Sequence, residues 1–144
     1  MGRMAAPDNL RLRQTRNIEV TYAGAEASVA ASVCNFGGTA RYVTALPKHA
    51  LAEATMDSLR AVGIDTSHVL RTDTGRLGLY FLETGANQRP SNVIYDREDS
   101  AIAITAASDY DWDVIFAGAQ WLHLSGITPA LSRTAAEATR VAAE

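Results

Sequence analysis

The sequence has few of the residues on which a disulfide framework, a cysteine-based metal site or a membrane segment depends. Its 144 residues include one cysteine, Cys34, which excludes an internal disulfide and a zinc site built from cysteines. No run approaches the roughly 18 apolar residues of a membrane-spanning helix, and the first residues have no apolar signal-peptide stretch. We therefore expect a cytoplasmic protein, with Cys34 as a buried helix thiol.

Positive charge is also scarce. The chain has 13 Lys and Arg against 16 Asp and Glu, a net charge of −3, which gives no support to a nucleic-acid or membrane partner. The one basic cluster, near the start, is interpreted as solvated side chains on a strand or loop. It consists of Arg3, Arg11, Arg13 and Arg16. With 47% hydrophobic residues, the length suffices for one core.

Familiar nucleotide-binding and nucleophile motifs are missing. The sequence contains no Gly-x-x-x-x-Gly-Lys-Ser/Thr loop, no Gly-x-Gly-x-x-Gly turn and no Gly-x-Ser-x-Gly elbow. The three histidines are not spaced like metal ligands. His123 lies inside an apolar run and is expected to be a core residue with its hydrogen bonds made. From the residues alone, no nucleophile or general base can be identified.

Three alternating aspartates, Asp109, Asp111 and Asp113, imitate the opening of a calcium-binding loop. Such a loop needs glycine at its sixth position and glutamate at its twelfth, where this chain has Val114 and Gln120. The aspartates are therefore interpreted as acidic residues at a helix N-terminus.

Hydrophobic periodicity in the first half predicts an α/β fold. An extended run at 18–22 leads into a helix over 25–36, in which Ala25, Val29 and Val33 repeat every four residues and Phe36 closes the stripe. Gly37 is expected to cap that helix. A strand at 41–46, a helix from 51 to 62 and a strand at 68–71 follow. This order implies right-handed crossovers and a parallel sheet.

The pattern then changes to a hairpin, with strands at 76–84 and 92–97 and no helix between them. Large side chains occupy both faces, so the hairpin is expected to pack against something on each side, as a flap over a site or a dimer surface. A short helix at 112–117 and a buried strand at 121–125 follow. The last helix, capped by Ser132, runs to the final residue without a stop signal. No complete strand precedes Met4, and the chain is expected to be a piece of a larger sheet.

Two places could hold a small polar ligand. At the corner where the run 18–22 meets the helix, Gly24 lacks a Cβ, and the helix N-terminus aims free N–H groups at the same point. On the hairpin, Tyr95 and Arg97 are two residues apart and so lie on the same face. The arginine offers a planar fork of donors to a carboxylate, and the phenols of Tyr80 and Tyr95 can hydrogen-bond sugar hydroxyls. Spacing alone favours the alternative, in which the arginine stacks on a tyrosine at a solvated surface.

In combination, these stretches resemble the N-terminal half of a ribokinase-like (PfkB) sugar kinase, and within that family most resemble 2-keto-3-deoxygluconate kinases. The resemblance rests on six stretches in the family's order, which cover nearly the whole chain. They are AGAEASVA (23–30), YVTALP (42–47), VGIDTSHV (62–69), LGLYFLE (77–83), VIYDR (93–97) and LHLSGI (122–127).

The resemblance implies that residues 1–144 are the N-terminal portion of a three-layer α/β/α kinase fold whose C-terminal half is missing. A small β-lid, with strands at about 9–22, 76–84 and 92–97, would cover the sugar and often forms the dimer contact. By the same resemblance, Gly24 and Ser28 contact the sugar from the corner, and Tyr80, Tyr95 and Arg97 contact it from the lid. Arg97 would face the carboxylate of a keto-deoxy acid.

The chain departs from the family in three ways. Ala23 replaces the first glycine of a pair, and Ser28 replaces an asparagine, so its sugar contact would be shorter or water-mediated. The Gly-Ala-Gly-Asp segment, which carries the catalytic base and the anion hole, does not occur. The first family strand is expected to be clipped just before Gly2.

The expected function is the sugar-binding part of an ATP- and magnesium-dependent kinase that phosphorylates 2-keto-3-deoxygluconate. No catalytic residue is assigned, and neither ATP nor magnesium is expected to bind this chain alone, which is therefore expected to be inactive. Two alternatives remain: an inactive fragment that binds the sugar acid or forms a homodimer through the lid, and a nonfunctional remnant. Arg97 favours an acid over ribose or fructose.

Overall fold

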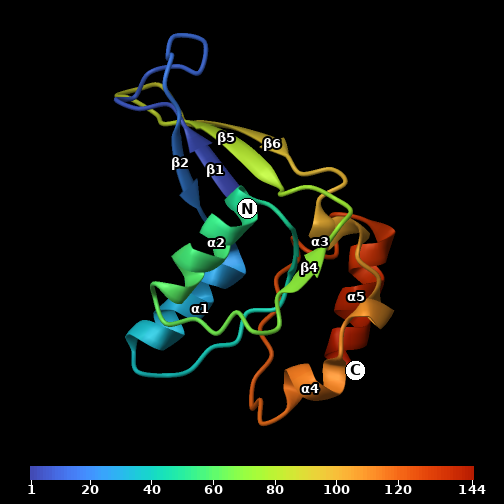
Figure 1. Ribbon diagram of the computed structural model, residues 1–144. Helices are drawn as coiled ribbons and strands as arrows, with labels where there is room; N and C mark the ends of the chain where they lie inside the picture. Colours follow the sequence, from blue (N-terminus) through green and yellow to red (C-terminus); the bar gives the residue numbers. More distant parts are fainter.

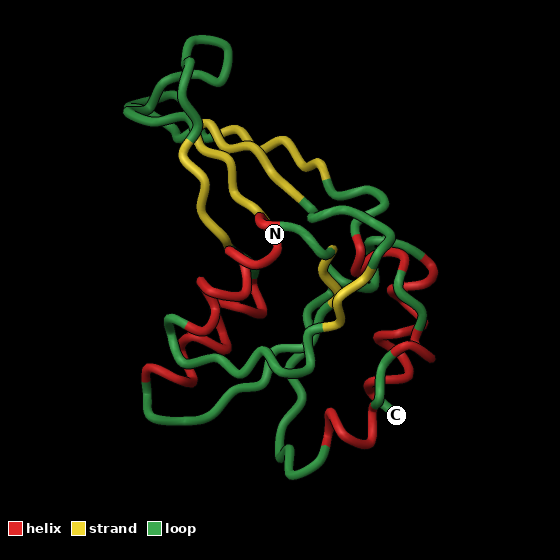
Figure 2. The backbone as a smooth tube through the Cα atoms, viewed as in Figure 1, coloured by secondary structure: helices red, strands yellow, loops and turns green.

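The computed structural model describes all residues, 1–144, as a mixed α/β fold with two sheets (Figures 1 and 2). In chain order, the elements are β1 (Gly2–Ala5), β2 (Glu19–Tyr22), α1 (Ala25–Asn35), β3 (Ala45–Pro47), α2 (Ala50–Arg60), β4 (Leu70–Thr72), β5 (Leu79–Glu83), β6 (Asn92–Asp96), α3 (Ala101–Ile104), the 3-10 turn η1 (Ala107–Asp109), α4 (Trp112–Phe116) and α5 (Arg133–Ala143). None of these helices has both the length and the apolar character that a membrane crossing requires.

The body of the molecule has helices on both sides of the β3–β4 pair. In Figure 1, α1 and α2 lie on one side of this pair, and α3, α4 and α5 lie on the other. The two strands are parallel, with Ala45 opposite Leu70 and Pro47 opposite Thr72. The expected parallel strand–helix–strand order is confirmed for β3, α2 and β4, although β3 is shorter than the predicted strand and includes Pro47 at its end. The run 18–22, expected in the same parallel sheet, instead supplies β2 to the other sheet, where it is antiparallel to β1.

The second sheet, here called the lid, projects from the body (Figure 2). Its strand order is β2-β1-β5-β6, with β1 antiparallel to β2 and parallel to β5, and with β5 antiparallel to β6. The hairpin prediction is confirmed over 79–83 and 92–96. Of the lid strand expected at 9–22, only 19–22 is a strand. The first residues, for which a complete strand was not expected, form the central strand β1 because both of its neighbours supply backbone partners.

Three groups of buried side chains hold the body together. Between α2 and the strands lie Leu46, Ala52, Met56, Val69 and Leu77; between α1 and α2 lie Ala30, Leu59 and Ile64; under α4 and α5 lie Tyr110, Ile115 and Ala138. Burial of this apolar area is the main favourable term for the fold.

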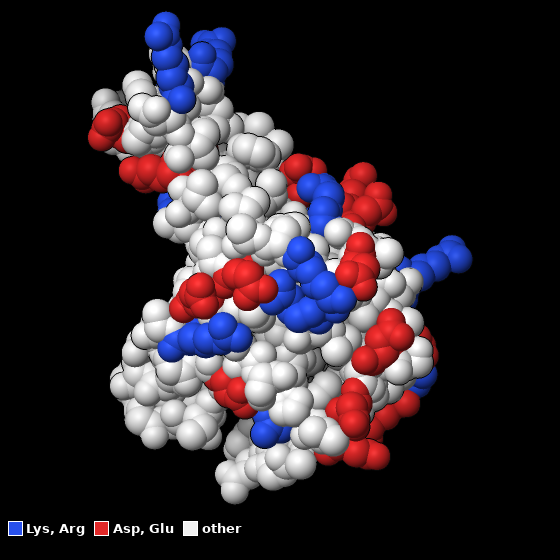
Figure 3. Space-filling model, in the orientation of Figure 1, with Lys and Arg blue, Asp and Glu red and all other residues white.

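The apolar stripe predicted for α1 does not face this core. Val29 and Val33 are each 40% exposed and Phe36 is 91% exposed. Small residues occupy the inner face instead, with Ala30 buried and Cys34 half-buried and 3.4 Å from the Gly63 carbonyl. The surface over α1 in Figure 3 accordingly carries few charges.

The prediction of a buried strand at 121–125 is wrong. Trp121 is 92% exposed, and His123, expected in the core, is exposed as well. An apolar run becomes a buried strand only when a neighbouring strand pairs with it, and no strand of either sheet pairs with this segment. The short helix at 112–117 is confirmed as α4, and Gly37 takes the positive φ of a helix cap (+83°).

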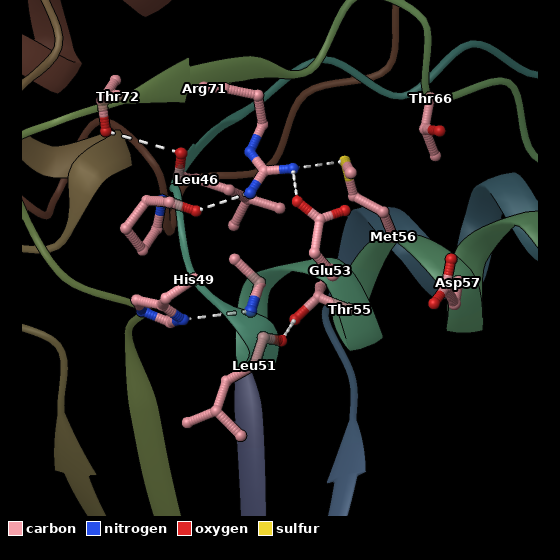
Figure 4. A network of polar contacts seen from close by, with 12 residues as sticks. Leu46, His49, Leu51, Glu53, Thr55, Met56, Asp57, Thr66, Arg71 and Thr72 are labelled. Atoms are coloured by element: carbon pink, nitrogen blue, oxygen red, sulfur yellow. Dashed lines mark hydrogen bonds and ion pairs between the residues drawn. The ribbon is translucent and has the colours of Figure 1, made fainter.

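Arg71 ties α2 to the β3–β4 pair, as Figure 4 shows. Its guanidinium pairs with Glu53, donates to the Pro47 carbonyl at 2.9 Å and lies 3.7 Å from the Met56 sulfur. The helix begins at His49, whose Nδ1 accepts from the Ala52 N–H at 3.3 Å. One side chain on β4 therefore contacts both β3 and α2.

Candidate functional site

A cavity of about 80 Å³ lies where the lid meets the body. Each part of its wall comes from a different segment of the chain. Gly24 and Glu26 line it from the start of α1, Gly78 from the approach to β5, and Arg97 and Ser100 from the turn after β6. These segments, about seventy residues apart in the sequence, meet at one place because α1 begins directly after β2, and β2 lies in the same sheet as β5 and β6.

The corner at Gly24 has the geometry expected from the sequence, since β2 ends at Tyr22 and α1 begins at Ala25. Gly24 is the N-cap of α1 and no side chain caps the helix there. Its backbone is extended (φ −178°), so its contribution is room: a Cβ would lie 3.6 Å from the Tyr42 hydroxyl. The first N–H groups of α1 therefore lack side-chain partners at this corner.

Ser28 is not among the residues that line this cavity. Its hydroxyl donates to the Gly24 carbonyl at 3.0 Å, one helical turn back, and the residue is exposed. It lies instead in a shallow hollow on the outer face of α1, with Val29, Val33 and Phe36. A short hydroxyl on a helix often bonds to its own backbone in this way. The structure therefore places Ser28 in contact with Gly24 but outside the cavity that Gly24 lines.

The three lid residues form one stack on one face of the lid. Tyr80 and Tyr95 lie directly opposite in the β5–β6 register, with ring centroids 6.1 Å apart. The Arg97 guanidinium carbon lies 4.4 Å from the Tyr95 ring centroid. The stacked arrangement expected as the alternative is therefore present. Arg97 also lines the cavity, whereas the two tyrosines adjoin it through Arg97.

Arg97 forms no ion pair within the chain. Its sequence neighbour Asp96 is already paired with Arg76, another residue of the cavity wall. A guanidinium that has no ion-pair partner is suited to an anionic ligand, for which it offers a planar fork of donors.

Two further groups shape the electrostatics of the cavity and were not singled out from the sequence. Burial, with the Glu26 charge nearby, raises the pKa of Tyr42 to about 12, so this phenol is a neutral donor at physiological pH. Glu26 accepts a hydrogen bond from Ser125. A third missed residue, Ser100, is 2% exposed, and its hydroxyl has no partner. The only sequence signal for it is a serine before a short apolar run.

The structure has no group of three or more His, Cys, Asp or Glu side chains that could hold a metal ion. The interpretation of the three aspartates as helix-capping residues is confirmed for Asp111, which accepts from the Val114 N–H at 3.2 Å. Asp109 accepts from the Ala106 N–H at 3.1 Å. These residues do not fit a magnesium–nucleotide complex, and we assign none of them to ATP.

Comparison with known proteins decides the family. The family description "pfkB family carbohydrate kinase" matches residues 5–144. The chain belongs to the PfkB family of carbohydrate kinases. Its structure superposes on the crystal structure of 2-dehydro-3-deoxygluconokinase from Thermotoga maritima with a TM-score of 0.95 and 45% identity, over 99% of this chain and 43% of that one. The expected ribokinase-like fold is thereby confirmed.

Two curated relatives have related names. The 2-dehydro-3-deoxygalactonokinase of Haloferax volcanii is 36% identical over 139 residues, 96% of this chain and 43% of the relative. The 2-dehydro-3-deoxygluconokinase of Bacillus subtilis is 32% identical over 111 residues, 76% of this chain and 34% of the relative. The chain thus spans less than half the length of the relatives that it matches.

Proposed function

We propose that this PfkB-family chain supplies the sugar-binding part of an ATP-dependent kinase that phosphorylates 2-keto-3-deoxygluconate. The observation that carries the proposal is the position of Arg97. It lines the same cavity as Gly24 and has no carboxylate partner in the chain. A sugar acid brings that carboxylate, and an arginine fork binds it by two parallel charge-assisted hydrogen bonds.

The relatives' names support an acid rather than a neutral sugar. One acts on 2-dehydro-3-deoxygluconate, which is 2-keto-3-deoxygluconate, and another on the galactonate. These compounds share the carboxylate and the adjacent ketone and differ in the configuration of a hydroxyl-bearing carbon. Tyr80 and Tyr95 supply phenols for such hydroxyls, and the open N-terminus of α1 at Gly24 supplies N–H donors.

Ser28 takes a lesser part in this proposal. Its hydroxyl hydrogen is used by the Gly24 carbonyl, but its oxygen can still accept a hydrogen bond from water. We therefore assign it a water-mediated contact to the ligand, in line with its position one turn beyond the cavity corner.

The phosphoryl donor in this proposal is ATP with magnesium, as the family implies. The 144 residues contain no Gly-Ala-Gly-Asp segment and no cluster suited to a metal ion. Phosphoryl transfer depends on a positioned base and on charge stabilisation around the γ-phosphate. We propose that the 144-residue chain alone does not phosphorylate the sugar acid. Product formed from ATP and 2-keto-3-deoxygluconate by the purified chain would contradict this.

Binding can be tested separately from catalysis, by titration calorimetry of the purified chain with 2-keto-3-deoxygluconate. The wild type should release heat, and Arg97→Ala should bind at least tenfold more weakly, since a hydrogen bond to a charged group contributes about 1.5–3 kcal/mol. Arg140→Ala is the matched control. It removes the same charge from an exposed α5 residue whose partners are Glu137 and Glu144. Absence of heat with the wild type would remove the sugar-acid proposal.

The opposite face of the lid favours a second role, homodimer formation. Four large apolar side chains lie in register across it, one from each strand: Val20, Met4, Phe81 and Ile94. Val20 is 45% exposed and Ile94 is 51% exposed. A solvated apolar stripe of this kind is typical of an interaction surface, and two copies of the same stripe can cover each other around a two-fold axis.

We expect sedimentation equilibrium to show a dimer of the wild-type chain and a monomer of Ile94→Lys. Val93→Lys is the control, because Val93 is similarly exposed, at 40%, on the other face of the same strand. If both variants associate like the wild type, the lid stripe is not the interface.

A further inference from the structure

Ser100 is a buried polar residue whose hydroxyl has no hydrogen-bond partner. It is 2% exposed and stands at the N-cap of α3. N-cap hydroxyls normally accept a hydrogen bond from the helix, as that of Ser132 does from the Ala135 N–H at 2.9 Å. The Ser100 hydroxyl makes no such bond, so it remains available to another group.

That hydroxyl belongs to a residue of the ligand cavity. Four side chains in the structure have a buried polar atom without a hydrogen-bond partner, and Ser100 is the only one of them that lines this cavity. The others are Arg71, Arg89 and Tyr110. A buried hydroxyl without a partner costs free energy in the ligand-free protein, and a ligand that accepts its hydrogen bond removes that cost.

The backbone holds Ser100 beside Arg97. The Ser100 N–H donates to the Arg97 carbonyl at 3.4 Å, and the Ser100 carbonyl accepts from the N–H groups of Ala103 and Ile104. Gly78 lies against both residues: a Cβ there would be 3.3 Å from the Arg97 Cβ and 3.5 Å from the Ser100 Cβ. The position of Ser100 relative to Arg97 is thus set by a short turn and by contact with Gly78, the residue before β5.

We propose that the Ser100 hydroxyl donates a hydrogen bond to the carboxylate of the sugar acid, next to the group that Arg97 binds. The proposal deepens the sugar-acid function described above and rests on it. A carboxylate accepts hydrogen bonds only and has about four acceptor positions, so one arginine fork leaves room for a hydroxyl donor. An O–H bond to a carboxylate is also among the stronger hydrogen bonds in proteins.

The test is calorimetry with 2-keto-3-deoxygluconate on the wild-type chain and Ser100→Ala. We expect the variant to bind at least tenfold more weakly. Its melting temperature without ligand should be unchanged or higher, because the substitution removes an unsatisfied buried hydroxyl and leaves the Cβ in place.

Thr105→Val is the matched control. Thr105 is also buried, at 5%, and close in sequence, but its hydroxyl donates to the Ala101 carbonyl at 2.8 Å and it does not line the cavity. Loss of the Thr105 hydroxyl should lower the melting temperature and leave the affinity for 2-keto-3-deoxygluconate unchanged. A purely structural role for Ser100 would instead make both variants melt lower.

Each outcome separates the two proposals. No heat with the wild type overturns the sugar-acid function and, with it, the role of Ser100. If the wild type releases heat and Ser100→Ala binds with an affinity within twofold of the wild-type value, only the Ser100 proposal is overturned. A lower melting temperature of Ser100→Ala, matching Thr105→Val, also overturns it. D-Fructose, which has no carboxylate, should bind wild type and Ser100→Ala equally; an equal loss for fructose overturns the carboxylate assignment.

Discussion

Gly75 precedes the lid strand β5 and packs against Ala101 at the start of α3. Replacing Gly75 by alanine should destabilise the chain strongly. The residue has a φ of +80°, in the region that L-residues rarely occupy. A Cβ there would lie 2.7 Å from the Ala101 Cα and 2.9 Å from its backbone nitrogen. Backbone atoms cannot rotate away as a flexible side chain can, so α3 has to move.

The magnitude follows from two costs. The left-handed backbone costs a non-glycine residue about 1 kcal/mol, and overpacking against fixed atoms costs about 2 kcal/mol more. The sum, about 3 kcal/mol, corresponds to a fall in melting temperature of roughly 12 °C for a domain of this size.

Gly37→Ala is the matched control for Gly75→Ala. Gly37 has nearly the same φ, +83°, but nothing lies within 4 Å of its Cβ position. It should therefore lose only the backbone contribution, about 1 kcal/mol. Urea unfolding followed by circular dichroism measures both free energies of unfolding. Equal losses for the two variants would refute the argument from steric contact with Ala101.

Three other perturbations test separate parts of the structure. Raising the pH from 10 to 12 should lower the free energy of unfolding. The pKa of Tyr42 is about 12 in the folded chain, so over this range mainly the unfolded chain loses the phenol proton. The urea midpoint should therefore fall less for Tyr42→Phe than for the wild type, and equal falls would contradict the prediction. Arg71→Ala should cost about 2 kcal/mol through its contact with the Pro47 carbonyl, whereas Lys48→Ala, which removes an exposed pair with Asp73, should cost about 0.5 kcal/mol or less; thermal melts that shift equally would exclude the difference. Ser132→Ala should cost about 1 kcal/mol by removing the cap of α5. Loss of helical circular dichroism on mild heating measures this cost, and Thr134→Ala, at a half-buried position of the same helix, is a control that should melt like the wild type.

Local signals were sufficient for much of the fold. The helix at α1, its glycine cap and the two lid strands follow from periodicity and from residues that favour turns, and these act over a few neighbours. The same holds for the shared face of Tyr95 and Arg97, which two-residue spacing in a strand requires. The corner at Gly24 was predictable for the same reason.

Other features depend on contacts distant in sequence. β1 is a strand because β2 and β5 lie on either side of it, and four residues alone do not indicate this. Conversely, the apolar run at 121–125 lacks a partner strand and stays exposed. The inner face of α1 is lined by small residues, which a search for large apolar side chains overlooks.

The candidate site residues divide in the same way. The sequence singled out Gly24 and Arg97, and both line the cavity. For Arg97, however, spacing alone favoured a solvated stack, and only the family resemblance indicated a ligand contact. Ser100 is significant only because burial leaves its hydroxyl unpartnered, and burial is a property of the assembled fold. Ser28 failed to reach the cavity because its hydroxyl bonds to the preceding helical turn.

The stack of Arg97 on Tyr95 has a consequence for the entropy of the sugar-acid binding proposed above. A free arginine side chain samples many rotamers and loses up to about 2 kcal/mol of conformational freedom when a ligand fixes it. The ring of Tyr95 already restrains the guanidinium, 4.4 Å from its centroid, before any ligand arrives. In the proposed sugar-acid complex, part of the entropic cost of fixing Arg97 is therefore met during folding. An aliphatic residue in place of Tyr95 would return that cost to each binding event.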